Sequence, residues 1–426
     1  MIAIIFLTFF ALVIIGVPIA LCMGLAGLIP VVAFTDIPIV VIMQKFFTGV
    51  DSLSLLAIPF FMLSGGLLDK GGVSRRLVDF ANSLVGWLPG GLAVVTFLAC
   101  AFFGAISGSS SATVVAMGAL LVPAMLKEGY PLRFTLATIA CGGWLGIVIP
   151  PSTPMIIYGI ATGTSTGSLF MGGFIPGFMC AAGMAIYAVW YGKYKLKLKT
   201  HKFSLRKVGK SFVDAIWALV MPLIILGGIY GGVFTPTEAA AVACLYGIIV
   251  GFLIYRELSW KDMGSILLNT VKTSSMILFI IAAATAFAYV LTIENVPNII
   301  AGAVMSFATE KWQFWVFVTI LLFITGMVME TTPAIMILAP ILMPMLPQYG
   351  IDPVAFGVVM IINLGIGYVT PPVGLNLYVA AGLVPGAKVG DVVNKHTVVY
   401  ILLAFIVLIV LMAFPQIIML LPNMME

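Results

Sequence analysis

The sequence predicts an all-α membrane protein whose helices cross the bilayer many times, and three observations support that fold class. Hydrophobic residues account for 62% of the 426 residues and charged residues for only 8%, whereas soluble domains carry roughly 25% charged residues. The mean hydropathy is +1.22. Apolar stretches such as residues 401–412 are continuous, whereas the strands of a membrane β-barrel alternate apolar and polar side chains. Soluble and barrel classes are therefore excluded, and a multi-pass helical bundle is predicted.

The N-terminal segment is predicted to be a retained membrane helix. Residues 1–15 are apolar, no basic segment precedes them and no small-residue cleavage site follows, so a signal peptide is not indicated. Residues 1–34 fit either one long tilted helix or two short ones. The five cysteines lie in apolar segments without the spacing of metal ligands, and we interpret them as buried small hydrophobic residues.

A basic linker, residues 193–210, divides the chain into two halves of similar pattern. Eight of the 20 Lys and Arg residues lie in this linker, which contains no acid. On this basis we predict two structural repeats, residues 1–192 and 211–426. A shift of 221 residues aligns Ser, Pro and Gly positions in the same order: Ser54 with Ser275, Pro123 with Pro344, Gly129 with Gly350, and Pro150-Pro151 with Pro371-Pro372.

The distribution of Lys and Arg predicts that the two repeats are inverted relative to the membrane. Loops 69–80 and 127–133 of the first repeat are basic, whereas the equivalent loops 291–302 and 347–353 contain no basic residue. Because Lys and Arg accumulate on the cytoplasmic side, equivalent loops lie on opposite faces. The basic linker is likewise predicted to be cytoplasmic, with membrane lipids and no nucleic acid among the expected partners.

Each repeat is predicted to contain a re-entrant hairpin followed by a helix that is broken at Pro-Pro. The first hairpin covers about residues 87–126 and the first broken helix about 133–163; the second pair covers about 315–346 and 353–384. The first hairpin has basic loops on both flanks, so it enters and leaves on the cytoplasmic side. Its Gly- and Ser-rich middle, residues 104–111, suits a hairpin tip. The second hairpin is predicted to enter from the periplasm.

Four interruptions of the helices form the predicted functional site. They are the hairpin tips at 107–113 and 330–333 and the helix breaks at 146–154 and 367–376. Pro-Pro frees carbonyl oxygens of the preceding turn, and these oxygens with Ser and Thr hydroxyls suit a small cation such as Na⁺, while half-helix N-termini suit a carboxylate. Pro and Gly also kink membrane helices without any binding role. Two breaks at matching positions, each after a polar tip, favour a site for cations and an anion.

Few charged residues fall within the apolar segments, and an acid at membrane depth is a functional candidate. Glu330 in the second tip is either a member of the site or a solvated tip residue. Glu238 follows Pro236, a combination typical of a helix start, so we interpret it mainly as structural. Asn376 is a more plausible ligand than Asn363.

Enzyme signatures are absent from the sequence, so no catalytic residue and no cofactor is predicted. The two histidines, His201 and His396, have no neighbouring residues suited to acid-base catalysis or metal binding. The sequence also lacks the Gly-rich loop ending in Lys-Ser/Thr that binds ATP. A membrane enzyme acting on lipids would need His, Asp or Glu clustered at one depth. Transport driven by an ion gradient is therefore predicted. Na⁺ is favoured over protons because the tips are rich in hydroxyls and poor in acids, whereas a proton-coupled carrier would have to use Glu330 or Glu238.

Four motifs resemble those of the large membrane subunit of tripartite ATP-independent periplasmic (TRAP) transporters, and together they extend over essentially the whole chain. They are FGAISGSSSAT (103–113), GIVIPPSTP (146–154), TPTEAA (235–240) and GYVTPPVG (367–374). The resemblance implies a Na⁺-driven importer of an organic-acid anion in the bacterial inner membrane, working by an elevator mechanism. It implies two partners, a soluble periplasmic substrate-binding protein and a separate small membrane subunit of about four helices.

The resemblance also implies which residues bind the ions and the substrate. The first Na⁺ site would use Ser107, Ser109, Gly146, Ile149 and Pro151. The second site, by the internal symmetry, would use Thr331, Thr332, Gly367, Thr370 and Pro372. The substrate would lie between the tips, near Ser110, Glu330 and Asn376. Sialic acid (N-acetylneuraminate) is the first expected substrate and a C4-dicarboxylate the next; a stand-alone or proton-coupled anion carrier of the same fold is the alternative.

Overall fold

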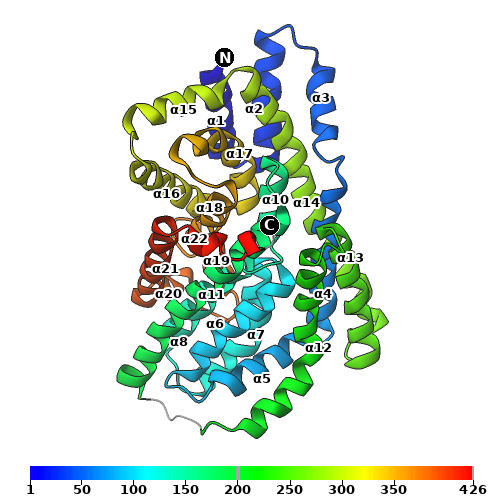
Figure 1. The fold of residues 1–426 in the computed structure, drawn as a ribbon, viewed down its shortest axis with the longest axis vertical. Helices are drawn as coiled ribbons and strands as arrows, with labels where there is room; N and C mark the ends of the chain where they lie inside the picture. Colours follow the sequence, from blue (N-terminus) through cyan, green and yellow to red (C-terminus); the bar gives the residue numbers. More distant parts are fainter. Residues whose placement is uncertain (198–201, 425–426) are drawn as a thin grey trace.

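The computed structural model describes residues 1–197 and 202–424 and confirms the predicted all-α membrane fold (Figure 1). Nine helices in these residues are long and apolar enough to cross a membrane, or up to ten if the bent pair of residues 132–148 and 153–162 forms one span. Such helices expose apolar faces: in α21 (Lys395–Ala413), Leu402, Ile406 and Ile409 are each more than half exposed. Contact with lipid accounts for these faces.

The N-terminal residues form two short helices, which decides between the alternatives that the sequence leaves open. α1 (Ile2–Ile15) ends at Gly16, whose φ of 87° lies in the left-handed region that glycine tolerates. α2 (Ile19–Phe34) and α3 (Ile39–Thr48) follow. Both pack on α14 (Trp260–Ile293), a helix of 34 residues.

The rest of the first half consists of helices and short connections. η1 (Leu53–Leu56) and α4 (Ala57–Lys70) lead to the amphipathic α5 (Val73–Val85). The elements that follow are α6 (Gly91–Ser107), α7 (Ser110–Lys127), α8 (Leu132–Gly143), α9 (Leu145–Val148), α10 (Thr153–Thr162), α11 (Thr166–Tyr191) and the π-helical η2 (Gly192–Leu196).

The segment between the halves is shorter than the linker predicted at 193–210. η2 extends into the first residues of that range, and α12 (Leu205–Tyr230) already contains the last six. Ser204 is extended and precedes α12, so the helix begins where a polar residue can leave the helical conformation. Lys199 and His201 lie outside the described residues.

The second half begins with α12, and several of its elements align with elements of the first half at the predicted shift of 221 residues. α14 corresponds in sequence to α4, α15 to α5, and the α16–α17 pair to the α6–α7 pair. The inverted relation of the halves to the membrane stays a prediction. The elements after α12 are α13 (Pro236–Ile248), η3 (Ile249–Ile254), α14, α15 (Val296–Phe307), α16 (Lys311–Val328), α17 (Thr331–Leu342), η4 (Met343–Tyr349), α18 (Pro353–Gly367), α19 (Leu375–Ala381), α20 (Val389–Val392), α21, α22 (Gln416–Met419) and η5 (Pro422–Met424).

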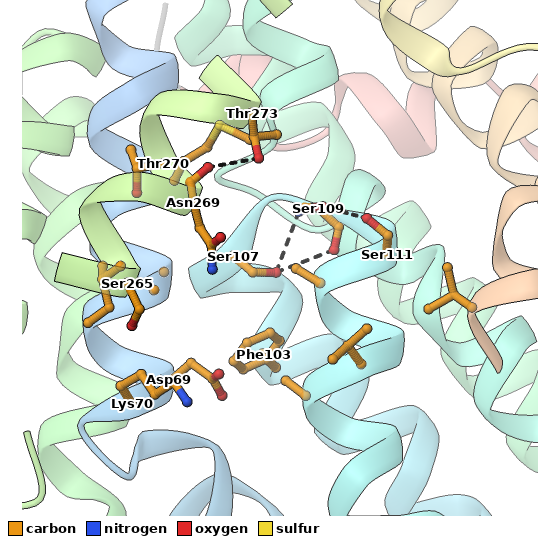
Figure 2. A pocket seen from close by; sticks show the side chains of 18 residues that line it. Asp69, Lys70, Phe103, Ser107, Ser109, Ser111, Ser265, Asn269, Thr270 and Thr273 are labelled. Atoms are coloured by element: carbon orange, nitrogen blue, oxygen red, sulfur yellow. Dashed lines mark hydrogen bonds between the residues drawn. The ribbon is translucent and has the colours of Figure 1, made fainter. Parts of the chain in front are cut away.

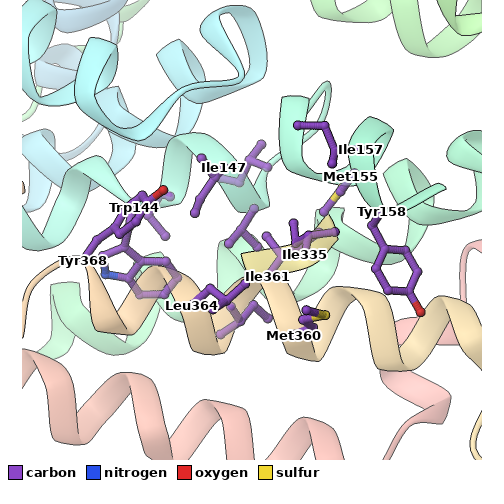
Figure 3. Close-up of a cluster of buried hydrophobic side chains, with 14 of the residues drawn as sticks. Trp144, Ile147, Met155, Ile157, Tyr158, Ile335, Met360, Ile361, Leu364 and Tyr368 are labelled. Atoms are coloured by element: carbon purple, nitrogen blue, oxygen red, sulfur yellow. The ribbon is translucent and has the colours of Figure 1, made fainter. Parts of the chain in front are cut away.

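The broken helices of the two halves pack against each other in the protein core. Figure 3 shows Trp144 and Ile147 near the first break in one cluster with Ile361 and Leu364 of α18, and all four are buried. The Tyr158 hydroxyl of α10 donates a hydrogen bond to the Pro353 carbonyl at the start of α18, at 2.9 Å. This packing fixes the positions of the two Pro-Pro breaks relative to each other.

Candidate functional site

The first hairpin tip is a tight turn between two helices. α6 ends at Ser107, Gly108 adopts a φ of 59°, and Ser109 is extended before α7 begins at Ser110. A Cβ atom on Gly104 would lie 2.8 Å from Gly146 Cα, so glycine allows the hairpin backbone to touch the broken helix. The tip is therefore held directly against the helix that carries the first Pro-Pro.

Three oxygen atoms converge at this contact. The Ser107 and Thr113 hydroxyls are 3.1 Å apart, and the Ser109 carbonyl accepts from Thr113 at 2.7 Å and from Ser107 at 3.4 Å. Gly146 lies beside them, because a Cβ there would be 2.3 Å from Thr113 Oγ1 and 2.7 Å from the Ser109 carbonyl oxygen. The structure thus brings Ser107, Ser109 and Gly146 together, and it adds Thr113, which lies one helical turn after Ser109.

The first break closes over the same tip. Ile149 leaves the helical conformation, and Pro150-Pro151 is cis. The Thr153 N–H donates to the Gly108 carbonyl at 3.4 Å, and a Cβ on Gly108 would lie 2.9 Å from the Pro151 carbonyl oxygen. The Pro151 carbonyl therefore reaches the tip. The Thr153 hydroxyl is buried and has no hydrogen-bond partner in the described part of the chain.

The second tip is tied to its own break by different residues. The Thr331 N–H donates to the Tyr368 hydroxyl at 2.8 Å, and that hydroxyl donates to Thr331 Oγ1 at 3.0 Å. A Cβ on Gly367 would lie 2.4 Å from the Gly326 carbonyl carbon, so this glycine pair repeats the contact of Gly104 with Gly146. Tyr368 was not among the predicted site residues.

The predicted residues of the second Na⁺ site are less closely grouped. Thr332 is buried beside Thr331 at the start of α17. The Thr370 hydroxyl donates to the Ile366 carbonyl at 3.0 Å, in the last turn of α18. Pro372 is exposed, whereas Pro151 in the equivalent first break is buried. The two breaks therefore differ in exposure although both contain Pro-Pro.

A small cavity of about 70 Å³ lies between the two tips, and we call it the tip cavity. Ser110 and Glu330 line it, as the prediction of a substrate between the tips requires. Asn376 lies behind Ser110: its Oδ1 accepts from the Ser110 hydroxyl at 2.9 Å and its Nδ2 donates to the Ala140 carbonyl at 3.0 Å. The fully buried Asn376 thus positions Ser110. Other polar residues around the tip cavity are Ser109, Ser111, Thr153, Thr273, Thr331, Thr332 and Tyr368.

Of the remaining candidate residues, Glu238 and Asn363 make hydrogen bonds that stabilise the fold, and Glu330 makes none through its carboxylate with the residues that the structure describes. Glu238 accepts hydrogen bonds from the N–H and the hydroxyl of Thr235, both at 2.8 Å, and so caps α13 as interpreted from the sequence. Asn363 donates to the Thr319 carbonyl at 3.1 Å. Glu330 is half-buried and its carboxylate accepts no hydrogen bond from the described residues. These residues form no cluster of His, Cys, Asp or Glu suited to a metal ion.

A larger cavity of about 410 Å³ adjoins the tip cavity, between the first hairpin and helices α4 and α14 (Figure 2). We call it the α14 cavity. The two cavities share part of their lining, namely Met62, Ser109, Ser111 and Thr273. Asp69 and Lys70 lie at the opposite end of the α14 cavity, at the end of α4.

Comparison with known proteins gives a consistent relationship over nearly the whole chain. The family model described as the DctM component of tripartite ATP-independent periplasmic transporters matches residues 6–417. The chain is 38% identical over 436 residues to the C4-dicarboxylate TRAP transporter large permease protein DctM of Rhodobacter capsulatus, covering 99% of this chain and 98% of that protein. It is 39% identical over 407 residues to the 2,3-diketo-L-gulonate TRAP transporter large permease protein YiaN of Escherichia coli, covering 95% of each.

Two further similarities concern length and fold. The chain is 43% identical over 411 residues to the isethionate TRAP transporter permease protein DctMQ of Oleidesulfovibrio alaskensis. That match covers 96% of this chain but 64% of the relative, so the chain spans less than two thirds of that protein. The crystal structure of the YdaH transporter of Alcanivorax borkumensis aligns with a TM-score of 0.62 over 89% of both chains. At 16% identity, this alignment supports the fold alone.

Proposed function

Because the chain belongs to the DctM family, the large membrane subunits of tripartite ATP-independent periplasmic transporters, we propose that it imports an organic-acid anion in symport with Na⁺. One observation carries the proposal: three oxygens of the first tip converge, and all three belong to hydroxyl or carbonyl groups. Neutral oxygen ligands suit a small hard monovalent cation and give no means of carrying a proton.

The first Na⁺ site is proposed at this convergence. Ser107 supplies a hydroxyl and Ser109 a carbonyl, and Gly146 leaves the space beside them. The carbonyls of Ile149 and Pro151 complete the proposed set from the break, and Thr113 adds a further hydroxyl. The second site is proposed at the other tip, using Thr331, Thr332, Gly367, Thr370 and Pro372.

The substrate anion is proposed to bind in the tip cavity. Both tips start a helix there, and the first N–H groups of a helix together with Ser and Thr hydroxyls donate to a carboxylate. Ser110 is held in place by Asn376, and Glu330 would lie beside the bound anion. Relatives from Rhodobacter capsulatus and Pseudomonas aeruginosa are both named for C4-dicarboxylates, so we place a C4-dicarboxylate first and sialic acid second.

An elevator movement is proposed in which the hairpins and broken helices move against α4 and α14. The contact surface is compatible with sliding, because Gly65 of α4, where an added Cβ would lie 3.3 Å from Ser107 Cα, presents no side chain to interlock with the hairpin. Large permease subunits of the family function with a periplasmic binding protein and a small membrane subunit. We propose that the small subunit here is a separate chain in the bacterial inner membrane.

The proposed function is tested by uptake into proteoliposomes that contain this chain and its small partner. Labelled succinate, sialic acid and isethionate are each supplied with and without an inward Na⁺ gradient, and with and without the matching periplasmic binding protein. We expect uptake of one anion only when both Na⁺ and the binding protein are present. Uptake with Na⁺ alone would indicate a stand-alone carrier, and uptake driven by a pH gradient would contradict Na⁺ coupling.

Replacing Glu330 by Gln separates Na⁺ coupling from proton coupling. We expect Na⁺-driven uptake to stay within about threefold of the unsubstituted protein, or about 0.7 kcal/mol, because the carboxylate receives no hydrogen bond and adds a negative charge beside an anion. The measurement is the initial uptake rate at several pH values with a fixed Na⁺ gradient. A fall in the uptake rate well beyond threefold, with a residual rate that no longer varies with pH, would support the proton-coupled alternative.

A further inference from the structure

The scaffold helix α14 carries polar side chains on the face that borders the α14 cavity. Ser265, Asn269 and Thr273 follow one another at intervals of four residues, so they share one side of the helix. Helix α14 is long enough to span a membrane, and its first half, which carries these three residues, also holds Lys261, Asp262 and Lys272. Polar groups of a membrane-spanning helix are accommodated where they line a cavity that water or a substrate can occupy.

The polar face of α14 lies beside the first hairpin tip. Figure 2 shows the Asn269 side chain pointing across the cavity towards Ser107, and Thr273 lines both the α14 cavity and the tip cavity. The side-chain amide of Asn269 makes no hydrogen bond to the described residues, and the Thr273 hydroxyl donates to the backbone carbonyl of Asn269 at 3.0 Å. Two N–H donors of Asn269 are therefore available to a ligand in the cavity.

We propose that Ser265, Asn269 and Thr273 form a release path for the organic anion, and that the Asn269 amide hydrogen-bonds its acidic group as it leaves the tips. This inference rests on the proposed function. At about 410 Å³ the cavity falls in the range of roughly 300–1,000 Å³ that is typical of small-molecule sites, whereas the tip cavity of about 70 Å³ does not.

The charges at the far end of the cavity favour passage over tight binding. Lys70 is the only basic side chain in the described lining, and it lies beside Asp69, whose carboxylate accepts from Ser74 at 2.5 Å. Asp262 at the start of α14 is also close enough to interact with Lys70. An anion that reaches this end meets acids as well as the ammonium group, so it is not held there.

Cysteine accessibility tests the path. The five native cysteines are buried, so Asn269→Cys provides a distinct reactive thiol. In inside-out vesicles with Na⁺ and the small subunit, a charged thiosulfonate reagent should modify Asn269→Cys. The test anion is succinate, or whichever tested anion the unsubstituted protein transports. At ten times the Kd of this anion for the α14 cavity, it should slow the modification of the Asn269→Cys thiol by about tenfold. Ser275→Cys, also exposed on α14 but outside both cavities, is the matched control and should react at an unchanged rate.

The outcomes separate this inference from the proposed function. Normal Na⁺-driven uptake without protection of Asn269→Cys, or with equal protection of Ser275→Cys, overturns the release path alone. Absence of uptake by the unsubstituted protein for every tested anion overturns the proposed function and the path with it. Asn269→Leu should also lower the uptake rate several-fold with unchanged Na⁺ dependence, and Asn269→Gln should restore it, because glutamine keeps the two N–H donors.

Discussion

Replacing Ser107 by Ala and Thr113 by Val together is expected to raise the Na⁺ concentration needed for half-maximal uptake by tenfold or more. Two of the three convergent oxygens at the first tip are lost, and hydrogen-bond-like contacts to a charged group contribute about 1.5–3 kcal/mol each. A loss of 1.4 kcal/mol corresponds to about tenfold in affinity. Substrate affinity at saturating Na⁺ should change much less. The measurement is the initial uptake rate as a function of Na⁺ concentration.

The control for this double variant is Thr96→Val in α6, the helix that ends at Ser107. Thr96 is buried and its hydroxyl donates to the Leu92 carbonyl at 2.8 Å, so its loss perturbs α6 without touching the tip. Thermal unfolding in detergent shows whether either protein is destabilised. If Ser107→Ala/Thr113→Val and Thr96→Val have the same Na⁺ dependence as the unsubstituted protein, the assignment of the first Na⁺ site is wrong.

The membrane fold and the interrupted helices could be predicted because their signals are local. Continuous apolar stretches indicate membrane spans. Pro150-Pro151 and Pro371-Pro372 indicate helix breaks whatever the tertiary contacts are, because proline lacks the backbone N–H. The extent of the linker was less predictable, because α12 begins within a basic segment that resembles a loop. Helix ends depend on capping and packing as much as on composition.

Parts of the site were not predictable because they depend on contacts between distant segments. Tyr368 meets Thr331 and Thr273 meets the first tip only after helices from different regions pack together. Thr113 could have been predicted from the sequence as a site residue, because it follows Ser109 by one helical turn. The role of Asn376 also required the structure, because its partners Ser110 and Ala140 lie more than 200 residues away.

Glycine pairs place each hairpin against its broken helix, and the two halves do so in the same way. Gly104 faces Gly146 in the first half, and Gly326 faces Gly367 in the second. At both contacts an added Cβ would approach backbone atoms to less than 3.0 Å, so these neighbours could not move aside without shifting a helix. The contact in the first half matters beyond packing because the Ser109 carbonyl oxygen of the tip lies beside Gly146.

Gly146→Ala is therefore expected to lower Na⁺-driven uptake by at least about tenfold, corresponding to about 1.4 kcal/mol or more. The added methyl group would lie 2.3 Å from Thr113 Oγ1 and 2.7 Å from the Ser109 carbonyl oxygen, so it would occupy the space proposed for the ion. Gly183→Ala is the matched control, because its Cβ would meet only Val407 at 3.5 Å. Uptake and the unfolding temperature of both variants are measured together. A Gly146→Ala protein that is folded but inactive separates an effect on the site from an effect on stability, whereas normal uptake would contradict an ion site beside Gly146.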